Sequence, residues 1–171
     1  KAEVIMAETV FITGASRGIG RAAAKAFGMA GYRVAVGCNI NRDAARELIA
    51  QFASAGVMAE IVEGDVADEN SVRDMVNQAQ RALGHISVLI NNAGVSCDAL
   101  FTDTTPDMWQ RTFDVNARGA YNTCRAVLPD MISRGRGSII NVSSVWGVYG
   151  GACEAAYSAS KAALIGLTKA L

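Results

Sequence analysis

Residues 9–20 read TVFITGASRGIG, an apolar run that passes into a glycine-rich turn and then into a helical pattern. The run Thr9–Ile12 predicts a buried strand, and apolar residues from Ile19 to Ala30 recur at helical spacing. A strand, a turn and a helix N-terminus in this order present backbone N–H groups and a helix dipole that attract phosphate. Glycines alone are weak evidence, because tight turns also use glycine without any ligand. The position of this turn between the first strand and the first helix is what favours phosphate binding.

The same alternation of strand and helix continues along the chain. Strands are predicted at residues 9–12, 32–36, 57–62, 86–90 and 138–142, and helices at 19–30, 45–52, 72–83, 106–133 and from 155 onward. Thr105 and Pro106 are typical of an N-cap and a first helical residue. Regular alternation implies right-handed βαβ units, so the predicted fold is α/β: a doubly wound parallel sheet of the Rossmann type in three αβα layers.

The whole chain, residues 1–171, is interpreted as one domain. The last helical pattern reaches Leu171 without a closing strand, so we expect the natural polypeptide to continue beyond it and its C-terminal strands to be missing here. Met6 is the expected natural start, and residues 1–5 would then be a cloning remnant.

Composition excludes several classes of protein. Hydrophobic residues make up 51% of the 171 residues and charged residues 19%, which is enough to fill a core. Sixteen basic residues balance 16 acidic ones, so the basic excess of a nucleic-acid binder is absent. No apolar run approaches the roughly 18 residues of a membrane span, so no membrane partner is expected.

The cysteines predict neither a metal site nor a disulfide framework, because no CxxC pair occurs among Cys38, Cys97, Cys124 and Cys153. We expect them to be small buried or half-buried side chains. With no secretory signal at the N-terminus, the expected location is the cytoplasm.

The end of the second predicted strand concerns the choice of cofactor. An Asp or Glu there would hold the ribose 2′-hydroxyl of NAD, but the strand ends in Cys38 and Asn39. Arg17 in the turn and Arg42 nearby could meet a 2′-phosphate, which favours NADP. The alternative is that both arginines are solvated surface charges.

Tyr157 and Lys161 lie four residues apart and therefore on one face of the last helix. A tyrosine hydroxyl in water has a pKa of about 10, and an ammonium held close to it favours the phenolate. Ser144 follows the fifth predicted strand and could hold a substrate carbonyl. Such a pair alone is common on surfaces; Ser144 at a strand end and the glycine turn favour a catalytic site.

Together these residues resemble the short-chain dehydrogenase/reductase family over essentially the whole chain. The motifs that carry the resemblance are Thr13-Gly14-x3-Gly18-x-Gly20, Asp65-Val66, Asn91-Asn92-Ala93-Gly94, Asp114-Val115-Asn116, Ser143-Ser144 and Tyr157-x3-Lys161. The resemblance implies a catalytic triad of Ser144, Tyr157 and Lys161, with Asn116 as a fourth member ordering a water-mediated proton relay. Tyr157 would give a proton to a ketone oxygen as NADPH delivers hydride to the carbon.

The resemblance also implies a cofactor site without any metal. Asp65 would contact adenine, Asn92 to Gly94 would line the ribose side, and Lys161 would bind the nicotinamide ribose. The implied cofactor residues are Gly14, Ser16, Arg17, Gly18, Ile19, Gly20, Asn39, Asp65, Val66, Asn92, Ala93, Gly94, Tyr157 and Lys161. Family members continue with further strands and a substrate lid, and they are usually homotetramers or dimers.

Within the family, residues 91–97 and 138–171 look most like 3-oxoacyl-[acyl-carrier-protein] reductases of fatty acid biosynthesis, which implies a small-molecule or carrier-bound ketone substrate. Leu100-Phe101-Thr102-Asp103, Trp146-Gly147 and Cys153-Glu154 are also similar to reductases that finish the 5-aminopentanone modification of elongation factor P, although Trp146, Cys153 and Glu154 could simply shape or pack the loop. A non-catalytic NADP-binding protein or an inactive fragment is the third alternative. We assign His85 to a turn, and Trp109 with Phe113 to helix packing.

Overall fold

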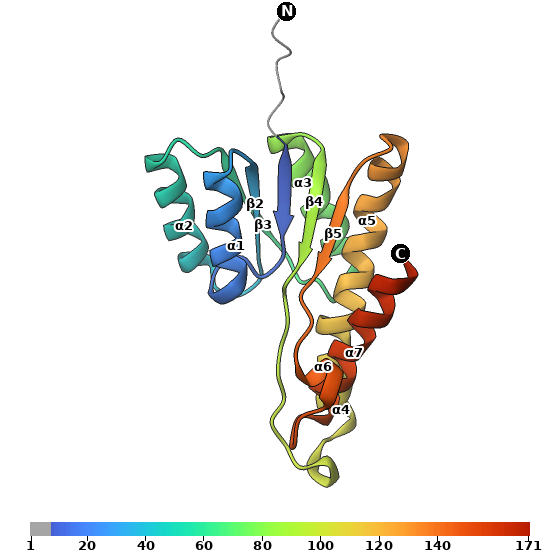
Figure 1. The fold of residues 1–171 in the computed structure, drawn as a ribbon. Helices are drawn as coiled ribbons and strands as arrows, with labels where there is room; N and C mark the ends of the chain where they lie inside the picture. Colours follow the sequence, from blue (N-terminus) through green and yellow to red (C-terminus); the bar gives the residue numbers. More distant parts are fainter. Residues whose placement is uncertain (1–7) are drawn as a thin grey trace, which may run out of the picture.

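The computed structural model describes residues 8–171, and the predicted start at Met6 lies outside them. Five parallel strands form one sheet in the order β3-β2-β1-β4-β5 (Figure 1). The strands are β1 (Thr9–Ile12), β2 (Arg33–Cys38), β3 (Ala59–Glu63), β4 (Ile86–Asn91) and β5 (Ser138–Asn141). This sheet confirms the predicted doubly wound α/β fold, and each predicted strand is found within a few residues of its expected place.

The helices fall between the strands as predicted, with two additions. They are α1 (Gly18–Met29), α2 (Arg42–Ser54), α3 (Glu69–Leu83), α4 (Pro106–Phe113), α5 (Gly119–Ser133), α6 (Trp146–Tyr149) and α7 (Ala155–Ala170). The single helix predicted over 106–133 contains a π-helical segment, Asp114–Arg118, between α4 and α5. Neither the short helix α6 nor the 3₁₀ turn Phe101–Asp103 was predicted.

Helix ends follow the local sequence signals. The Thr105 hydroxyl accepts a hydrogen bond from the Met108 N–H at 3.2 Å, and Pro106 is the first residue of α4, as predicted. Asp68 caps α3 in the same way, because its Oδ1 accepts from two backbone N–H groups of the first turn. Gly84 ends α3 with a φ of +84°, a backbone conformation that favours glycine.

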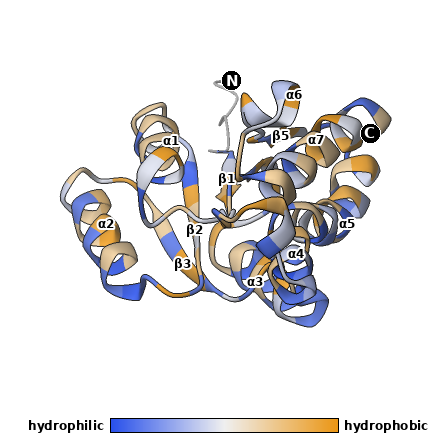
Figure 2. Cartoon of the chain, turned by 90° about the horizontal axis from the view of Figure 1, so that it is seen from below, coloured by the Kyte–Doolittle hydropathy of each residue, from blue (hydrophilic) through white to orange (hydrophobic). Residues whose placement is uncertain are grey.

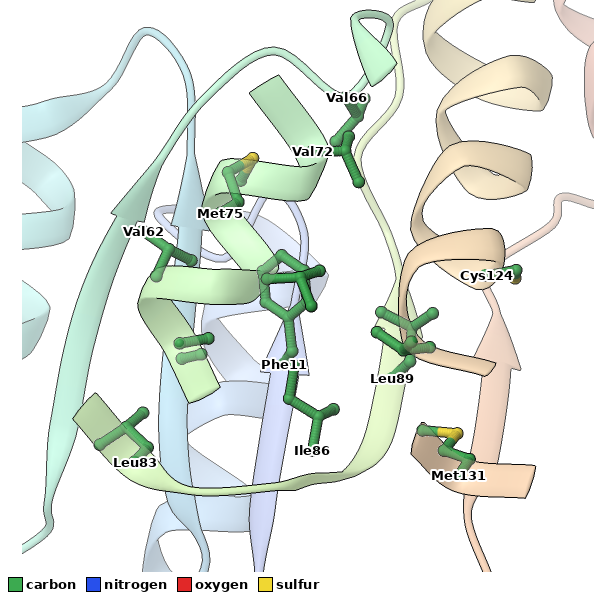
Figure 3. Packing of buried hydrophobic residues seen from close by; sticks show 14 of the residues in the cluster. Phe11, Val62, Val66, Val72, Met75, Leu83, Ile86, Leu89, Cys124 and Met131 are labelled. Atoms are coloured by element: carbon green, nitrogen blue, oxygen red, sulfur yellow. The ribbon is translucent and has the colours of Figure 1, made fainter. Parts of the chain in front are cut away.

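Two apolar cores lie on opposite faces of the sheet. Phe11 and Leu89 belong to the core beneath α3 and α5 (Figure 3). Val10 and Ile12 point to the other face and pack with residues of α1 and α2. Successive residues of a strand face opposite sides, so these buried strands require helices on both faces. Figure 2 shows α1 and α2 on one side of the strands and α3 and α5 on the other, which is the predicted three-layer arrangement.

The sheet order places a crevice beside β1. From β1 the chain builds outward to β2 and β3, then returns to form β4 and β5 on the other side. In open α/β sheets ligands bind at the carboxyl ends of the strands where the order reverses.

In the described residues, no helix is long and apolar enough to cross a membrane. Cys38 and Cys124 are buried and Cys97 is partly buried as expected, but Cys153 is exposed, so that prediction was wrong for Cys153.

Candidate active site

A hollow of about 300 Å³ lies at the carboxyl ends of β1, β2, β3 and β4. Most of the predicted cofactor residues line it: Gly14, Ser16, Arg17, Gly18, Ile19, Asn39, Asp65, Val66, Asn92, Ala93 and Gly94. Gly20, Tyr157 and Lys161 do not. The strand ends therefore bring together residues from four separate stretches of the sequence, as the parallel topology requires.

The glycine turn has the shape and the free donors that a phosphate needs. Gly14 and Gly18 have φ values of +63° and +54°, which suit glycine. Helix α1 begins at Gly18, and its N-cap residue Arg17 makes no capping hydrogen bond with its side chain. The first-turn N–H groups can therefore donate to phosphate oxygens, and the helix dipole adds favourable charge.

Gly20 belongs to the packing beneath this turn. A Cβ on Gly20 would collide with the Gly14 carbonyl oxygen and would lie 2.5 Å from Asn92 Nδ2. The absence of a side chain therefore lets α1 approach β1 and β4 closely. Gly20, the third glycine of the motif, does not line the hollow. Its part in the motif is this close packing of α1 on the turn.

Hydrogen bonds from the end of β4 hold the turn in shape. The Thr13 hydroxyl oxygen accepts from the backbone N–H groups of Asn92 and Ala93, both at 3.0 Å. Asn92 Nδ2 donates to the carbonyl oxygens of Thr13 at 3.0 Å and Gly14 at 3.1 Å. The Asn92 side chain is thus committed to the turn, and its place on the wall of the hollow follows from that role.

The end of β2 contributes no carboxylate, as predicted. Cys38 is buried there, and burial, followed by the Glu63 carboxylate, raises the pKa of its thiol. Arg42 Nε forms an ion pair with Glu63 Oε2 at 3.0 Å, and Arg42 does not line the hollow. Arg17 does line the hollow and forms no ion pair with any described residue. Of the two arginines, only Arg17 lines the hollow, and the assignment of the 2′-phosphate to it stays a prediction.

Arg111 reaches the hollow from α4 and was missed by the sequence analysis. Its Nη2 and Nη1 both approach Asp65 Oδ2, at 3.2 and 3.3 Å. The other carboxylate oxygen of Asp65, Oδ1, accepts from the Ala67 N–H at 2.9 Å. Arg111 and Asp65 are 46 residues apart, and no local spacing pattern connects them. Only a three-dimensional arrangement could reveal this pair.

Tyr157 and Lys161 share one face of α7, as their spacing predicted. Lys161 is buried, its Nζ donates to the Val142 carbonyl oxygen at 2.7 Å, and Nζ lies 5.7 Å from the centre of the Tyr157 ring. Burial lowers the pKa of the Lys161 ammonium. The ammonium of Lys161 is thereby held at Val142, directly before Ser143 and Ser144, and close to the Tyr157 ring.

Ser144 lies between β5 and α6, in a segment fastened to α7. Its hydroxyl oxygen accepts from the Trp146 N–H at 3.2 Å, and the neighbouring Ser143 hydroxyl donates to the Lys161 carbonyl oxygen at 2.7 Å. A Cβ on Gly147 would lie 2.8 Å from the Lys161 carbonyl carbon, so α6 packs directly on α7. The segment that carries Ser144 is thus fixed relative to the helix that carries Tyr157.

Asn116 lies in the π-helical segment and is buried. Its Oδ1 accepts from the Val95 N–H at 2.8 Å, and its Nδ2 donates to the Val95 carbonyl oxygen and to Ser160 Oγ, both at 2.9 Å. Ser160 Oγ in turn donates to the Tyr157 carbonyl oxygen at 2.7 Å. Both amide protons of Asn116 are therefore used to connect the loop after β4 with helix α7.

Gly94 connects the hollow to these residues. It lines the hollow, and a Cβ built on it would lie 3.3 Å from Asn116 Oδ1 and 3.4 Å from Lys161 Nζ. Asn116 Oδ1 and Lys161 Nζ therefore lie just behind Gly94, next to the hollow that Gly94 lines. The glycine turn and Arg17 lie on the wall formed by the end of β1 and the start of α1. In the described residues, no group of three or more metal-ligating side chains occurs.

The parallel sheet, the glycine turn and the hollow beside them define a dinucleotide-binding domain of the Rossmann type. The chain belongs to the short-chain dehydrogenase family, because the model of that family, described as "short chain dehydrogenase", matches residues 8–171. The predicted resemblance is thereby confirmed.

Similar proteins include reductases of 3-oxoacyl groups. The chain is 35% identical over 164 residues to a 3-oxoacyl-[acyl-carrier-protein] reductase of Staphylococcus epidermidis, covering 96% of this chain and 67% of that protein. It is 41% identical over 166 residues to an acetoacetyl-CoA reductase of Paracoccus denitrificans, covering 97% and 66%. The chain spans about two thirds of the length of these relatives.

A solved structure shares the fold closely. It is a gluconate 5-dehydrogenase from Burkholderia cenocepacia in complex with NADP and tartrate, with a TM-score of 0.87 and 35% sequence identity. The match covers 95% of this chain and 64% of that one.

Proposed function

We propose that this chain carries the active site of an NADPH-dependent carbonyl reductase that converts a ketone to an alcohol. The observation that carries the proposal is the position of Gly94, which lines the hollow and lies beside Asn116 Oδ1 and Lys161 Nζ at the same time. Such contiguity is what a redox enzyme needs, because the reactive end of its cofactor must lie beside the groups that handle protons.

The residues of the hollow fit NADP. The glycine turn and the first turn of α1 would hold the pyrophosphate. Arg17 and Asn39 would hold the 2′-phosphate, since β2 ends without a carboxylate that would repel it. The structural relative from Burkholderia cenocepacia binds NADP, which supports the same assignment here. When bound, NADPH supplies the hydride that reduces the carbonyl carbon.

The chain's own residues would then handle the proton and the substrate oxygen. The Tyr157 hydroxyl donates a proton to the carbonyl oxygen of the ketone as that carbon is reduced, so that an alcohol is formed. The Lys161 ammonium stabilises the negative charge left on the phenolic oxygen, and the Ser144 hydroxyl donates a hydrogen bond to the substrate oxygen. Asn116 is the fourth member of the set, and its side chain positions the Val95 loop against α7.

For the substrate we propose a 3-oxoacyl thioester on a carrier protein or on coenzyme A, in line with the relatives from Staphylococcus epidermidis and Paracoccus denitrificans. The aminopentanone alternative rests on the segments 100–103, 146–147 and 153–154. A Cβ on Gly151 would lie 3.1 Å from the Trp146 ring, which agrees with Trp146 packing on its own loop.

The test is NADPH oxidation with acetoacetyl-CoA, and with 5-ketogluconate as the competing substrate class. Tyr157→Phe should lower turnover by about 10²–10⁴-fold, the usual contribution of a positioned general acid, and should leave NADPH binding within about twofold. Tyr149→Phe is the matched control, because Tyr149 is 82% exposed on α6 and should change neither quantity.

Retained turnover in Tyr157→Phe would contradict the assigned proton donor. NADPH binding without turnover on either substrate would favour the non-catalytic alternative. Turnover of 5-ketogluconate alone would contradict the proposed thioester substrate but would leave the proposed carbonyl reductase activity standing.

A further inference from the structure

The end of the hollow formed by Arg111, Asp65, Val66 and Val115 has a chemistry unlike that of the glycine turn. Val66 and Val115 are both buried, 7% and 6% exposed, and both line the hollow. A Cβ on Gly119 would lie 2.7 Å from Val66 Cγ2, so the start of α5 is packed tightly behind this wall. An apolar wall suits a neutral group better than a phosphate.

The charges at this end cancel each other. Arg111 is paired with Asp65, whose carboxylate lies within 3.2 Å of Nη2. Arg17, by contrast, forms no ion pair with any residue in the described part of the chain. A dinucleotide therefore meets an uncompensated cation where its phosphates lie and a neutralised guanidinium at the Asp65 end. This difference assigns the phosphates to Arg17 and leaves Arg111 for an uncharged group.

The hydrogen bonds between Arg111 and Asp65 restrict the orientation of the planar guanidinium group. Both of its terminal nitrogens approach the same oxygen, Asp65 Oδ2, which restrains the guanidinium plane before any ligand arrives. A planar guanidinium stacks well on aromatic rings, and it does so at lower entropic cost when its rotation is already restricted. The Asp65 oxygens keep unused lone pairs that could accept from an amino group at the edge of such a ring.

We infer that the guanidinium of Arg111, restrained by Asp65, stacks on the adenine ring of the bound dinucleotide and is a cofactor-binding residue. This inference rests on the proposed function, since it assumes that the hollow takes NADP. It assigns to Arg111 the recognition of an aromatic base, apart from the role of Asp65 at the edge of that base.

The experiment measures binding of adenosine 2′,5′-bisphosphate, which carries the adenine and the 2′-phosphate but no nicotinamide, by titration calorimetry. Arg111→Ala should weaken binding about three- to fivefold, the size expected for one exposed cation–aromatic contact. Arg111→Lys should lose nearly as much, because an ammonium keeps the charge but not the plane.

Arg118→Ala is the matched control. Arg118 also lies on the helical run after Pro106, is paired with an aspartate at 2.9 Å, and has a side chain 54% exposed against 52% for Arg111. It does not line the hollow, so its loss should leave binding unchanged. All variants are first compared by thermal melting to establish that they are folded.

Three results would overturn the inference: unchanged affinity in Arg111→Ala, full affinity in Arg111→Lys, or an equal loss in Arg118→Ala, which would indicate a general charge effect. These results leave the proposed function standing as long as the unaltered protein binds NADPH. Failure of the unaltered protein to bind either NADPH or the bisphosphate would reject the proposed function, and the assignment of Arg111 with it.

Discussion

Lys161 combines a cost to folding with its proposed role in the site. It is buried, and among the described residues its Nζ has a backbone carbonyl oxygen as hydrogen-bond partner and no carboxylate in an ion pair. Burial without an opposite charge disfavours the ammonium, which is why the pKa of Lys161 is lowered. The folded protein accepts this cost at the site proposed for proton transfer, where a cation beside Tyr157 would stabilise its phenolate.

The lowered pKa predicts an unusual dependence of stability on pH. Between the folded pKa of Lys161 and the unfolded lysine value of about 10.4, the unfolded chain binds a proton that the folded chain has released. The free energy of unfolding should therefore rise with pH in that window, by up to about 1.4 kcal/mol per pH unit, relative to Lys161→Met. Urea unfolding of both proteins from pH 7 to pH 10 measures the difference.

The control for this prediction is Lys169→Met, which removes an exposed lysine of the same helix. Its unfolding free energy should run parallel to that of the unaltered protein over the whole pH range. Parallel curves for Lys161→Met as well would mean that the buried ammonium imposes no cost on the fold.

The sequence predicts the positions of some site residues but not their contact partners. Spacing places Tyr157 and Lys161 on one helix face, and glycines mark a turn whatever surrounds them. The partners of these residues come from distant segments: Val142 for Lys161, and Arg111 for Asp65. Such contacts depend on how helices pack across the sheet, and no local pattern in the sequence reports them.

At the scale of elements, the strands and long helices could be predicted because each buries its own apolar face. The π-helical segment Asp114–Arg118 could not. Its helical propensity is ordinary, and what accompanies the wider turn is the Asn116 side chain bonded to Val95 and Ser160. A tertiary hydrogen bond of this kind alters a helix without leaving a signal in its hydrophobic periodicity, and π-helical turns are frequent at functional sites.

Two helical glycines should respond oppositely to alanine. Gly20→Ala places a Cβ against the Gly14 carbonyl oxygen and Asn92 Nδ2, so it should lower the free energy of unfolding by about 1–3 kcal/mol. Gly166→Ala, in α7, meets no atom within 4 Å and should raise it by about 0.5–1 kcal/mol. Urea unfolding of both variants measures these changes. Equal effects of the two substitutions would mean that α1 does not pack on the turn as described.

At the scale of the whole molecule, the order β3-β2-β1-β4-β5 turns scattered motifs into one site. Every strand is parallel, so the segments after β1, β2, β3 and β4 all emerge at the same edge of the sheet. This part of the site follows from the sequence, because alternating strands and helices permit few topologies. The placement of α4 and α7 around the Gly94 end does not, since it depends on packing between helices.

Cofactor binding should stabilise the whole fold through linkage. A ligand at about 100 times its dissociation constant adds about 2.7 kcal/mol to the free energy of unfolding. At equal concentrations NADPH should therefore raise the melting temperature more than NADH does, because in the proposed site Arg17 meets the 2′-phosphate. Arg17→Ala should narrow this difference, whereas Arg42→Ala, which breaks only the pair with Glu63, should preserve it.

Thermal melting with each nucleotide decides between the two arginines. Equal shifts for NADPH and NADH in the unaltered protein would contradict the NADP assignment. A difference that narrows in Arg42→Ala and persists in Arg17→Ala would reverse the roles of the two residues.

The hydrogen bonds that join Thr13 and Gly14 of the glycine turn to Asn92 and Ala93 have a kinetic consequence. They fix the backbone that would receive the pyrophosphate through contacts internal to the protein. Capture of a nucleotide then requires no slow folding of that loop, so the association rate should be limited by diffusion and orientation. Differences in affinity among nucleotides should accordingly appear as differences in residence time, with association rates that stay nearly constant.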